Sequence, residues 1–87
     1  MTNHDVAVWM AQQLETAPWL YQETVVYVIR DKFGDGFTYQ NSSGNLAIGR
    51  GVLKEFKIIT GDRVVWEGGA KAWRKRRDGD RLGRKQG

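Results

Sequence analysis

The chain has 87 residues and a mass of 9.9 kDa, enough for one small domain, which excludes a second. Hydrophobic residues make up 40% of it, which argues against disorder throughout, and no apolar run approaches the roughly 20 residues that span a bilayer. There is no cysteine, so disulfides and thiolate zinc sites are excluded. Without a signal-peptide pattern, we expect a soluble, cytoplasmic protein that does not bind membranes.

Positive charge is concentrated in the C-terminal part of the chain. Residues 1–49 hold two basic and five acidic side chains, a net charge of −3, whereas residues 50–87 hold twelve basic and five acidic ones, a net charge of +7. A localised basic region on a domain of pI about 9.7 suits a polyanionic partner, although many small proteins are basic for solubility alone.

The first predicted helix begins at Asn3 and ends near Ala17. Asn3 is a suitable N-cap, and the apolar residues Val6, Met10 and Leu14 follow with helical spacing. Pro18 disfavours helical conformation in the residue before it, so the helix should end there.

Residues 20–33 give conflicting signals. The β-branched and aromatic run at 24–29 favours a strand by propensity. Tyr21, Val25, Ile29 and Phe33 nevertheless repeat every four residues, and Gly34 is well placed to end a helix. We therefore predict a helix.

A short strand at 37–39 and a polar loop at 40–44 precede a third predicted helix over 45–61, with Asn45 as its N-cap and Gly61 as its end. At 100° per residue, its apolar stripe comprises Ile48, Val52, Phe56 and Ile59. Arg50, Lys54 and Lys57 share a separate stripe.

Gly68-Gly69 lies between two strand-like runs and predicts a hairpin with a two-residue turn. Pairing Glu67 with Ala70 then places Val64, Trp66 and Trp73 on one face, which we expect to pack on the helices.

This order of helix, helix, short strand, helix, strand, turn and strand predicts an α+β fold of the winged helix-turn-helix type. It has three helices, a C-terminal β-hairpin as the wing and a short extra strand. We assign the winged-helix-like domain to residues 1–77, and we expect the basic, Gly-rich residues 78–87 to form a disordered tail.

Four stretches of the chain resemble signature sequences of a family of small uncharacterised bacterial proteins, some of which are found in mobile gene cassettes. They are LYQE at 20–23, GNLAI at 44–48, VVWE at 64–67 and WRKR at 73–76. The resemblance covers nearly the whole chain and implies no particular function. The pair Gly49 and Gly51 departs from the family's third helix.

Catalytic chemistry has few candidate residues. His4 is the only histidine and lies next to a terminus, and no phosphate-binding loop or HExxH motif is present. Asp78 and Asp80 offer too few oxygen ligands for a calcium loop. We therefore predict that the protein is not an enzyme, needs no cofactor or metal and has no evident small-molecule substrate.

The favoured function is binding of duplex DNA. In a winged helix the third helix enters the major groove, and the wing reaches the phosphates beside it. The candidate contacts come from the third helix, the wing and the segment after it: Arg50, Lys54, Lys57, Lys71, Arg74, Lys75, Arg76 and Arg77. Base recognition would need Arg50 or polar residues of the 41–45 loop.

Three other interpretations stay open, one of which is RNA rather than DNA as the nucleic acid. The cationic stripe is also what any solvated helix face looks like. Alternatively, the same scaffold is a protein-interaction or homodimerisation module without a nucleic-acid ligand, with Val8, Trp9, Trp19 and Tyr27 as anchors.

Overall fold

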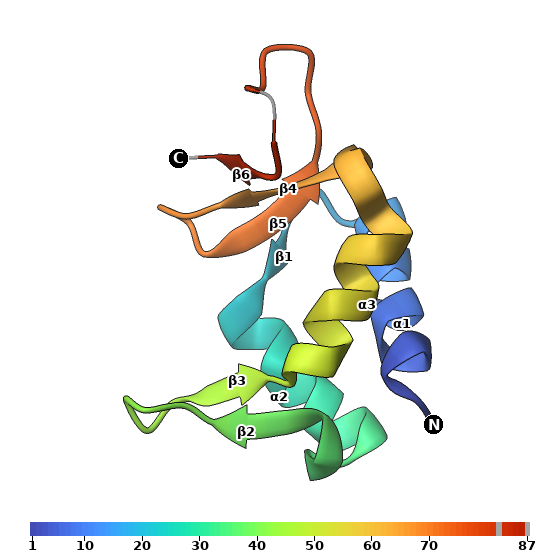
Figure 1. Cartoon of the computed structure of the whole chain (residues 1–87), viewed down its shortest axis with the longest axis vertical. Helices are drawn as coiled ribbons and strands as arrows, with labels where there is room; N and C mark the ends of the chain where they lie inside the picture. The colour runs from blue at the N-terminus through green and yellow to red at the C-terminus, as the bar shows by residue number, and fades with distance from the viewer. Residues whose placement is uncertain (82, 87) are drawn as a thin grey trace.

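A computed structural model describes residues 1–81 and 83–86 (Figure 1), and these residues combine three α-helices with two β-sheets. The helices are α1 (Asn3–Thr16), α2 (Gln22–Phe33) and α3 (Arg50–Thr60). The strands are β1 (Leu20–Tyr21), β2 (Thr38–Gln40), β3 (Leu46–Ile48), β4 (Val64–Glu67), β5 (Ala72–Lys75) and β6 (Lys85–Gln86). Short 3-10 helices at Asp35–Phe37 and Gly61–Arg63 lead into β2 and β4. The predicted α+β class is confirmed.

The larger sheet is mixed. Its strand order is β1-β5-β4-β6, in which β4 and β6 are parallel and the other neighbours are antiparallel. The hairpin of β2 and β3 forms a separate two-stranded sheet. The tips of the two hairpins, residues 68–71 and 41–45, project from the same side of the molecule (Figure 1).

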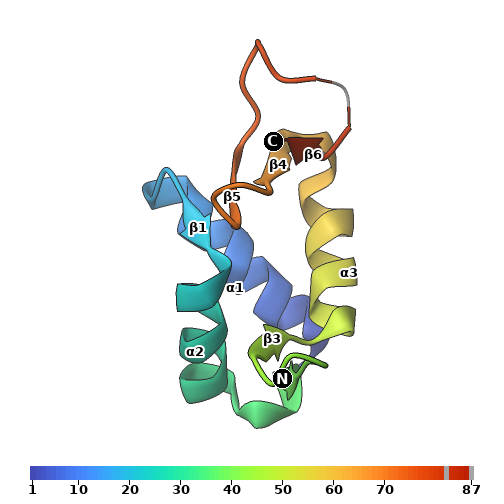
Figure 2. The same cartoon turned by 90° about the vertical axis from the view of Figure 1, so that its left-hand side faces the viewer.

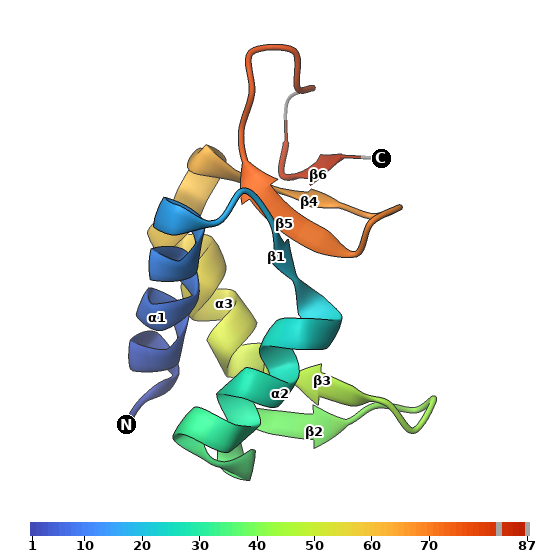
Figure 3. The same cartoon turned by 180° about the vertical axis from the view of Figure 1, so that it is seen from behind.

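The three helices enclose the core. Seen toward the hairpin tips, α1 lies between α2 and α3 (Figure 2), and from behind α1 runs along α3 (Figure 3). The core comprises Val6, Met10 and Leu14 of α1, Val25, Val26 and Ile29 of α2, and Val52 and Phe56 of α3, closed by Leu20, Ile48, Val64 and Trp73. Among the described residues, no helix combines the length and apolar character needed to cross a bilayer.

All three helices end at their C-termini where the sequence predicts, but each differs from the prediction at its N-terminus. Thr2, rather than Asn3, caps α1: its hydroxyl accepts from the Asp5 amide at 3.2 Å, and the Asp5 carboxylate accepts from the Thr2 amide at 2.9 Å. α1 ends before Pro18 as predicted. Gly34 and Gly61 end α2 and α3 as predicted, with φ angles of 99° and 52° that favour glycine.

The predicted starts of the second and third helices are wrong. Leu20 and Tyr21 pair with Trp73 and Ala72 as strand β1, so α2 begins only at Gln22. Residues 46–48 are likewise a strand, because they pair with β2, and α3 begins at Arg50 with Gly49 rather than Asn45 as its N-cap. In both places, pairing with another strand overrides the local helical pattern.

The hairpin register is wrong by two residues. Glu67 pairs with Ala72 rather than Ala70, and residues 68–71 form the turn, with Lys71 at a φ of 51°. A shift of two residues keeps every side chain on its predicted face. Val64 and Trp73 therefore lie in the core with Trp66 packed against them, as expected.

The segment beyond residue 77 returns to the larger sheet. β6 pairs with β4, and the amides of Trp66 and Gly68 donate to the carbonyls of Arg84 and Gln86 at 2.7 and 2.9 Å. Leu82 and Gly87, which belong to the expected disordered tail, lie outside the described residues. Disorder of this segment in solution stays a prediction.

Candidate nucleic-acid interface

Helix α3 presents three cations on one exposed face. Arg50, Lys54 and Lys57 are all exposed, and the helical repeat places them within about 60° of one another along about 10 Å of axis. None of the three forms an ion pair with a described residue. The Arg50 guanidinium lies 5.7 Å from the centroid of the Tyr39 ring on β2. We call Arg50, Lys54 and Lys57 the α3 cationic face.

An apolar residue lies on the same face. Ile58 is 66% exposed, and its position in the helical repeat is next to Lys54. Ile58 is not among the predicted contacts, although the helical projection that places the cations on this face also places Ile58 there. An exposed isoleucine beside lysines offers an apolar contact, of the kind that meets a thymine methyl group in the major groove.

Lys71 lies at the tip of the β4–β5 hairpin, next to α2. Its carbonyl accepts from the Gln22 amide at 3.1 Å, which holds the turn against the start of α2. Its side chain lines a cleft of about 600 Å³, and Lys57 lines a neighbouring cleft of about 420 Å³. Both clefts include Gln22 and Trp66, so Lys71 and Lys57 border adjoining surfaces.

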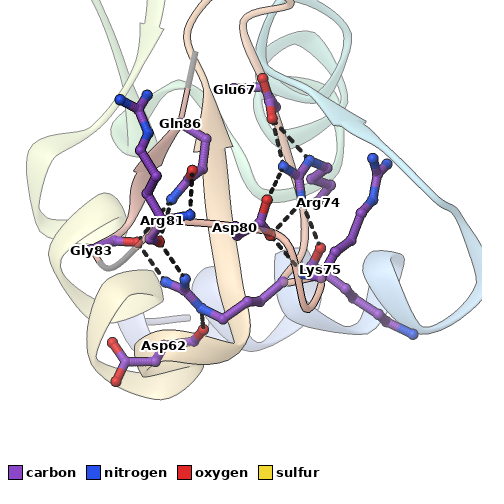
Figure 4. A network of polar contacts seen from close by, with 10 residues as sticks. Asp62, Glu67, Arg74, Lys75, Asp80, Arg81, Gly83 and Gln86 are labelled. Carbon is purple, nitrogen blue, oxygen red and sulfur yellow. Dashed lines mark hydrogen bonds and ion pairs between the residues drawn. The ribbon is translucent and has the colours of Figure 1, made fainter.

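Arg74 is buried in an ion triad and is not available to a ligand (Figure 4). Its guanidinium donates to the carboxylates of Glu67 and Asp80, with closest contacts of 2.6 Å to each. The hydrogen bonds from Arg74 and from the Arg77 amide hold the pKa of Asp80 well below its usual range. The Asp80 and Glu67 carboxylates in turn raise the pKa of Arg74.

The Arg76 side chain also forms its hydrogen bonds within the chain. Its guanidinium donates to the backbone carbonyls of Asp62, Arg81 and Gly83 (Figure 4). These contacts fasten the segment that follows β5 to the turn that precedes β4. Arg76 therefore organises the backbone.

Lys75 and Arg77 are exposed, but they lie on a different part of the surface from the α3 cationic face. Both line clefts that also contain Leu14 and Glu15, at the C-terminal end of α1. The Arg77 guanidinium lies 5.7 Å from the centroid of the Trp19 ring. The structure thus places Lys57 and Lys71 in adjoining clefts, with Arg50 and Lys54 on the same face of α3 as Lys57. Lys75 and Arg77 lie instead near the C-terminal end of α1, and Arg74 and Arg76 are held by contacts within the chain.

Two cations of the expected C-terminal tail lie beside Lys57. Arg84 and Lys85 line the same 420 Å³ cleft. Lys85 is in register with Trp66, so its side chain lies on the helix-facing side of the sheet. These residues reach the cleft because β6 pairs with β4. The sequence gives no periodic signal for β6, since the strand has only two residues and lies among glycines and charged residues.

The four side chains considered as protein-binding anchors are mostly covered. Val8, Trp9 and Trp19 are partly buried, and the Trp9 ring packs edge-on against Phe33 with a centroid separation of 5.5 Å. Tyr27 is 49% exposed. These side chains therefore do not gather into one exposed set.

Among the described residues, no three His, Asp or Glu side chains come together. The His4 ring lies 3.3 Å from the Glu55 carboxylate, where it links the start of α1 to the middle of α3.

Fold and surface together define a small α+β protein with an exposed cationic helix face beside a β-hairpin. A family model, described as a family of unknown function (DUF6953), matches residues 2–75. The chain belongs to this family. No curated protein and no solved structure matches the chain.

Proposed function

We propose that the protein is a winged-helix protein that binds duplex DNA through the α3 cationic face, Lys71 and Lys85. The fold has features that support a winged-helix relationship. A strand lies between α1 and α2, and it joins the C-terminal hairpin in the order β1-β5-β4. The β2–β3 hairpin then occupies the connection between α2 and α3. In this proposal the chain is a cytoplasmic relative of the small bacterial proteins that it resembles.

The observation that carries the proposal is the α3 cationic face. Three exposed cations share one face of the helix that would enter the major groove, and no described carboxylate pairs with them. A merely solvated face usually mixes both signs of charge. Here Glu55, the one acid of α3, lies on a different side of the helix, where it meets His4.

Fluorescence anisotropy of a labelled duplex, titrated over a series of salt concentrations, tests the proposal. If the five cations contact phosphates, the logarithm of the association constant should fall against that of the salt concentration with a slope of about −4.5. The double variant Lys54→Gln/Lys57→Gln should weaken binding and reduce the magnitude of the slope by about 1.8.

The matched control is Lys75→Gln/Arg77→Gln, which removes the same charge from the α1 side of the molecule. It should leave the slope nearly unchanged. Binding that does not respond to salt, or an equal loss in both double variants, would overturn the proposal.

A further inference from the structure

The 420 Å³ cleft between α3 and the larger sheet has an unusual lining. Its walls are formed by Gln22, Leu53, Phe56, Trp66 and Trp73, and its cations are Lys57, Arg84 and Lys85. We call it the aromatic cleft. Its volume falls within the roughly 300–1,000 Å³ of small-molecule sites.

Three aromatic rings form a continuous wall of the aromatic cleft. The centroids of Phe56 and Trp73 are 5.4 Å apart in an edge-to-face arrangement, and those of Trp73 and Trp66 are 4.8 Å apart. Phe56 and Trp73 are buried in the core, so the wall is held rigidly. Such a wall favours a flat apolar group, because an aromatic ring can stack or pack edge-on against it.

The charge of the aromatic cleft is entirely positive. Three of its lining residues are cations and none is an acid. Lys57 and Lys85 are exposed, and neither forms an ion pair with a described residue. An anion in the cleft would therefore meet no opposing carboxylate of its lining.

Arg84 adds the most specific feature. Its Nη1 donates to the Thr60 hydroxyl at 2.9 Å and to the Gly61 carbonyl at 3.1 Å, while its guanidinium lies 5.3 Å from the Phe56 ring centroid. Nε and Nη2 form no hydrogen bond within the described residues. Burial lowers the pKa of Arg84, and no described carboxylate offsets that cost. The guanidinium thus lies near an aromatic ring, and its Nε and Nη2 still carry three N–H groups that can donate.

We propose that the aromatic cleft binds a small planar aromatic anion of the carboxylate class. The ring packs against the partly exposed Trp66 beside the edge of Trp73. The carboxylate accepts hydrogen bonds from Arg84, with Lys57 and Lys85 adding positive charge. This site does not depend on DNA binding.

Titration of the isotope-labelled protein with 2-naphthoate, followed by NMR, tests the proposal. The indole N–H signals of Trp66 and Trp73 should shift with saturation, while those of Trp9 and Trp19 stay in place. The neutral analogue 2-naphthalenemethanol should bind at least about tenfold more weakly, since it lacks the charge-assisted hydrogen bonds.

Two double variants then distinguish binding in the aromatic cleft from an effect of the protein's net charge. Lys57→Gln/Lys85→Gln should weaken naphthoate binding several-fold, whereas Lys54→Gln/Lys71→Gln, with the same charge change outside the cleft, should not. Equal binding of the neutral analogue, shifts confined to Trp9 and Trp19, or equal weakening in both double variants would overturn the proposal.

Discussion

Gly49 joins strand β3 to helix α3 where the backbone leaves no room for a side chain. Its amide donates to the Phe37 carbonyl at 2.7 Å, and a Cβ atom built at Gly49 would lie 2.9 Å from the same oxygen. Its φ of −55° would suit any residue, so the conflict is purely steric. The predicted helix over 45–61 includes Gly49, whereas in the structure the residue precedes α3 as its N-cap.

Gly49→Ala should therefore destabilise the protein. Because the methyl group would push against backbone rather than a flexible side chain, we expect a loss of about 1–3 kcal/mol in the free energy of unfolding, measured by urea denaturation. Gly69→Ala is the control: a Cβ at Gly69 meets nothing within 4 Å and its φ is not positive, so its stability should equal or slightly exceed that of the wild type. Equal losses at the two sites would contradict this account.

Arg74 shows how a residue of a basic run can become structural. A lone buried guanidinium would be costly, and the carboxylates of Glu67 and Asp80 compensate it. Asp80 also accepts from the Arg77 amide at 2.6 Å, so one carboxylate fixes both the side chain of β5 and the turn after it. This arrangement brings the chain back to form β6.

Asp80→Asn should loosen β6 in a pH-dependent manner. The pKa of Asp80 in the folded protein lies below its ordinary value of about 3.9, so its contribution is complete above that pH and is lost as the pH falls toward the folded pKa. Hydrogen exchange should show less protection of the Trp66 and Gly68 amides in the variant at pH 7, and the difference should shrink in acid.

The control for this experiment is Asp78→Asn, because Asp78 is exposed and forms no ion pair within the described residues. Its exchange pattern should match that of the wild type at every pH. A loss of protection in Asp80→Asn that is the same in acid as at neutral pH would contradict a role for the Asp80 charge.

At the scale of the elements, the sequence predicts the features that depend on residues close together in the chain. The four-residue repeat through Val25 and Ile29 correctly outweighed β propensity, and Pro18 and Gly34 correctly marked helix ends. The helical projection also predicted that Arg50, Lys54 and Lys57 share an exposed face, which the structure confirms.

What the sequence could not predict depends on strand pairing and on side-chain contacts that leave no periodic pattern. Residues 46–48 continue the apolar pattern of α3, and only their pairing with β2 makes them a strand. The Gly68-Gly69 pair suggests a two-residue turn, but Trp66 pairs with Trp73, which brings two large rings into contact at a tilt, and the turn extends to four residues. The burial of Arg74 likewise depends on Asp80, which no periodicity links to it.

At the scale of the whole molecule, the two proposed surfaces share cations. Lys57 belongs both to the α3 cationic face and to the aromatic cleft, and Lys85 belongs to the cleft and to the proposed DNA contacts. A carboxylate bound in the cleft would neutralise part of the charge available to phosphates. Two sites that compete for the same charges are coupled, and the coupling is reciprocal.

Naphthoate at saturation should therefore weaken binding of the duplex, and saturating duplex should weaken naphthoate binding by the same factor. Because each phosphate contact contributes about 0.9 to the salt slope, loss of the Lys57 and Lys85 contacts should reduce its magnitude by up to about 1.8. Anisotropy titrations of the duplex with and without naphthoate measure this change. An unchanged affinity for duplex at saturating naphthoate would show that the two ligands do not share these lysines, whether or not each binds alone.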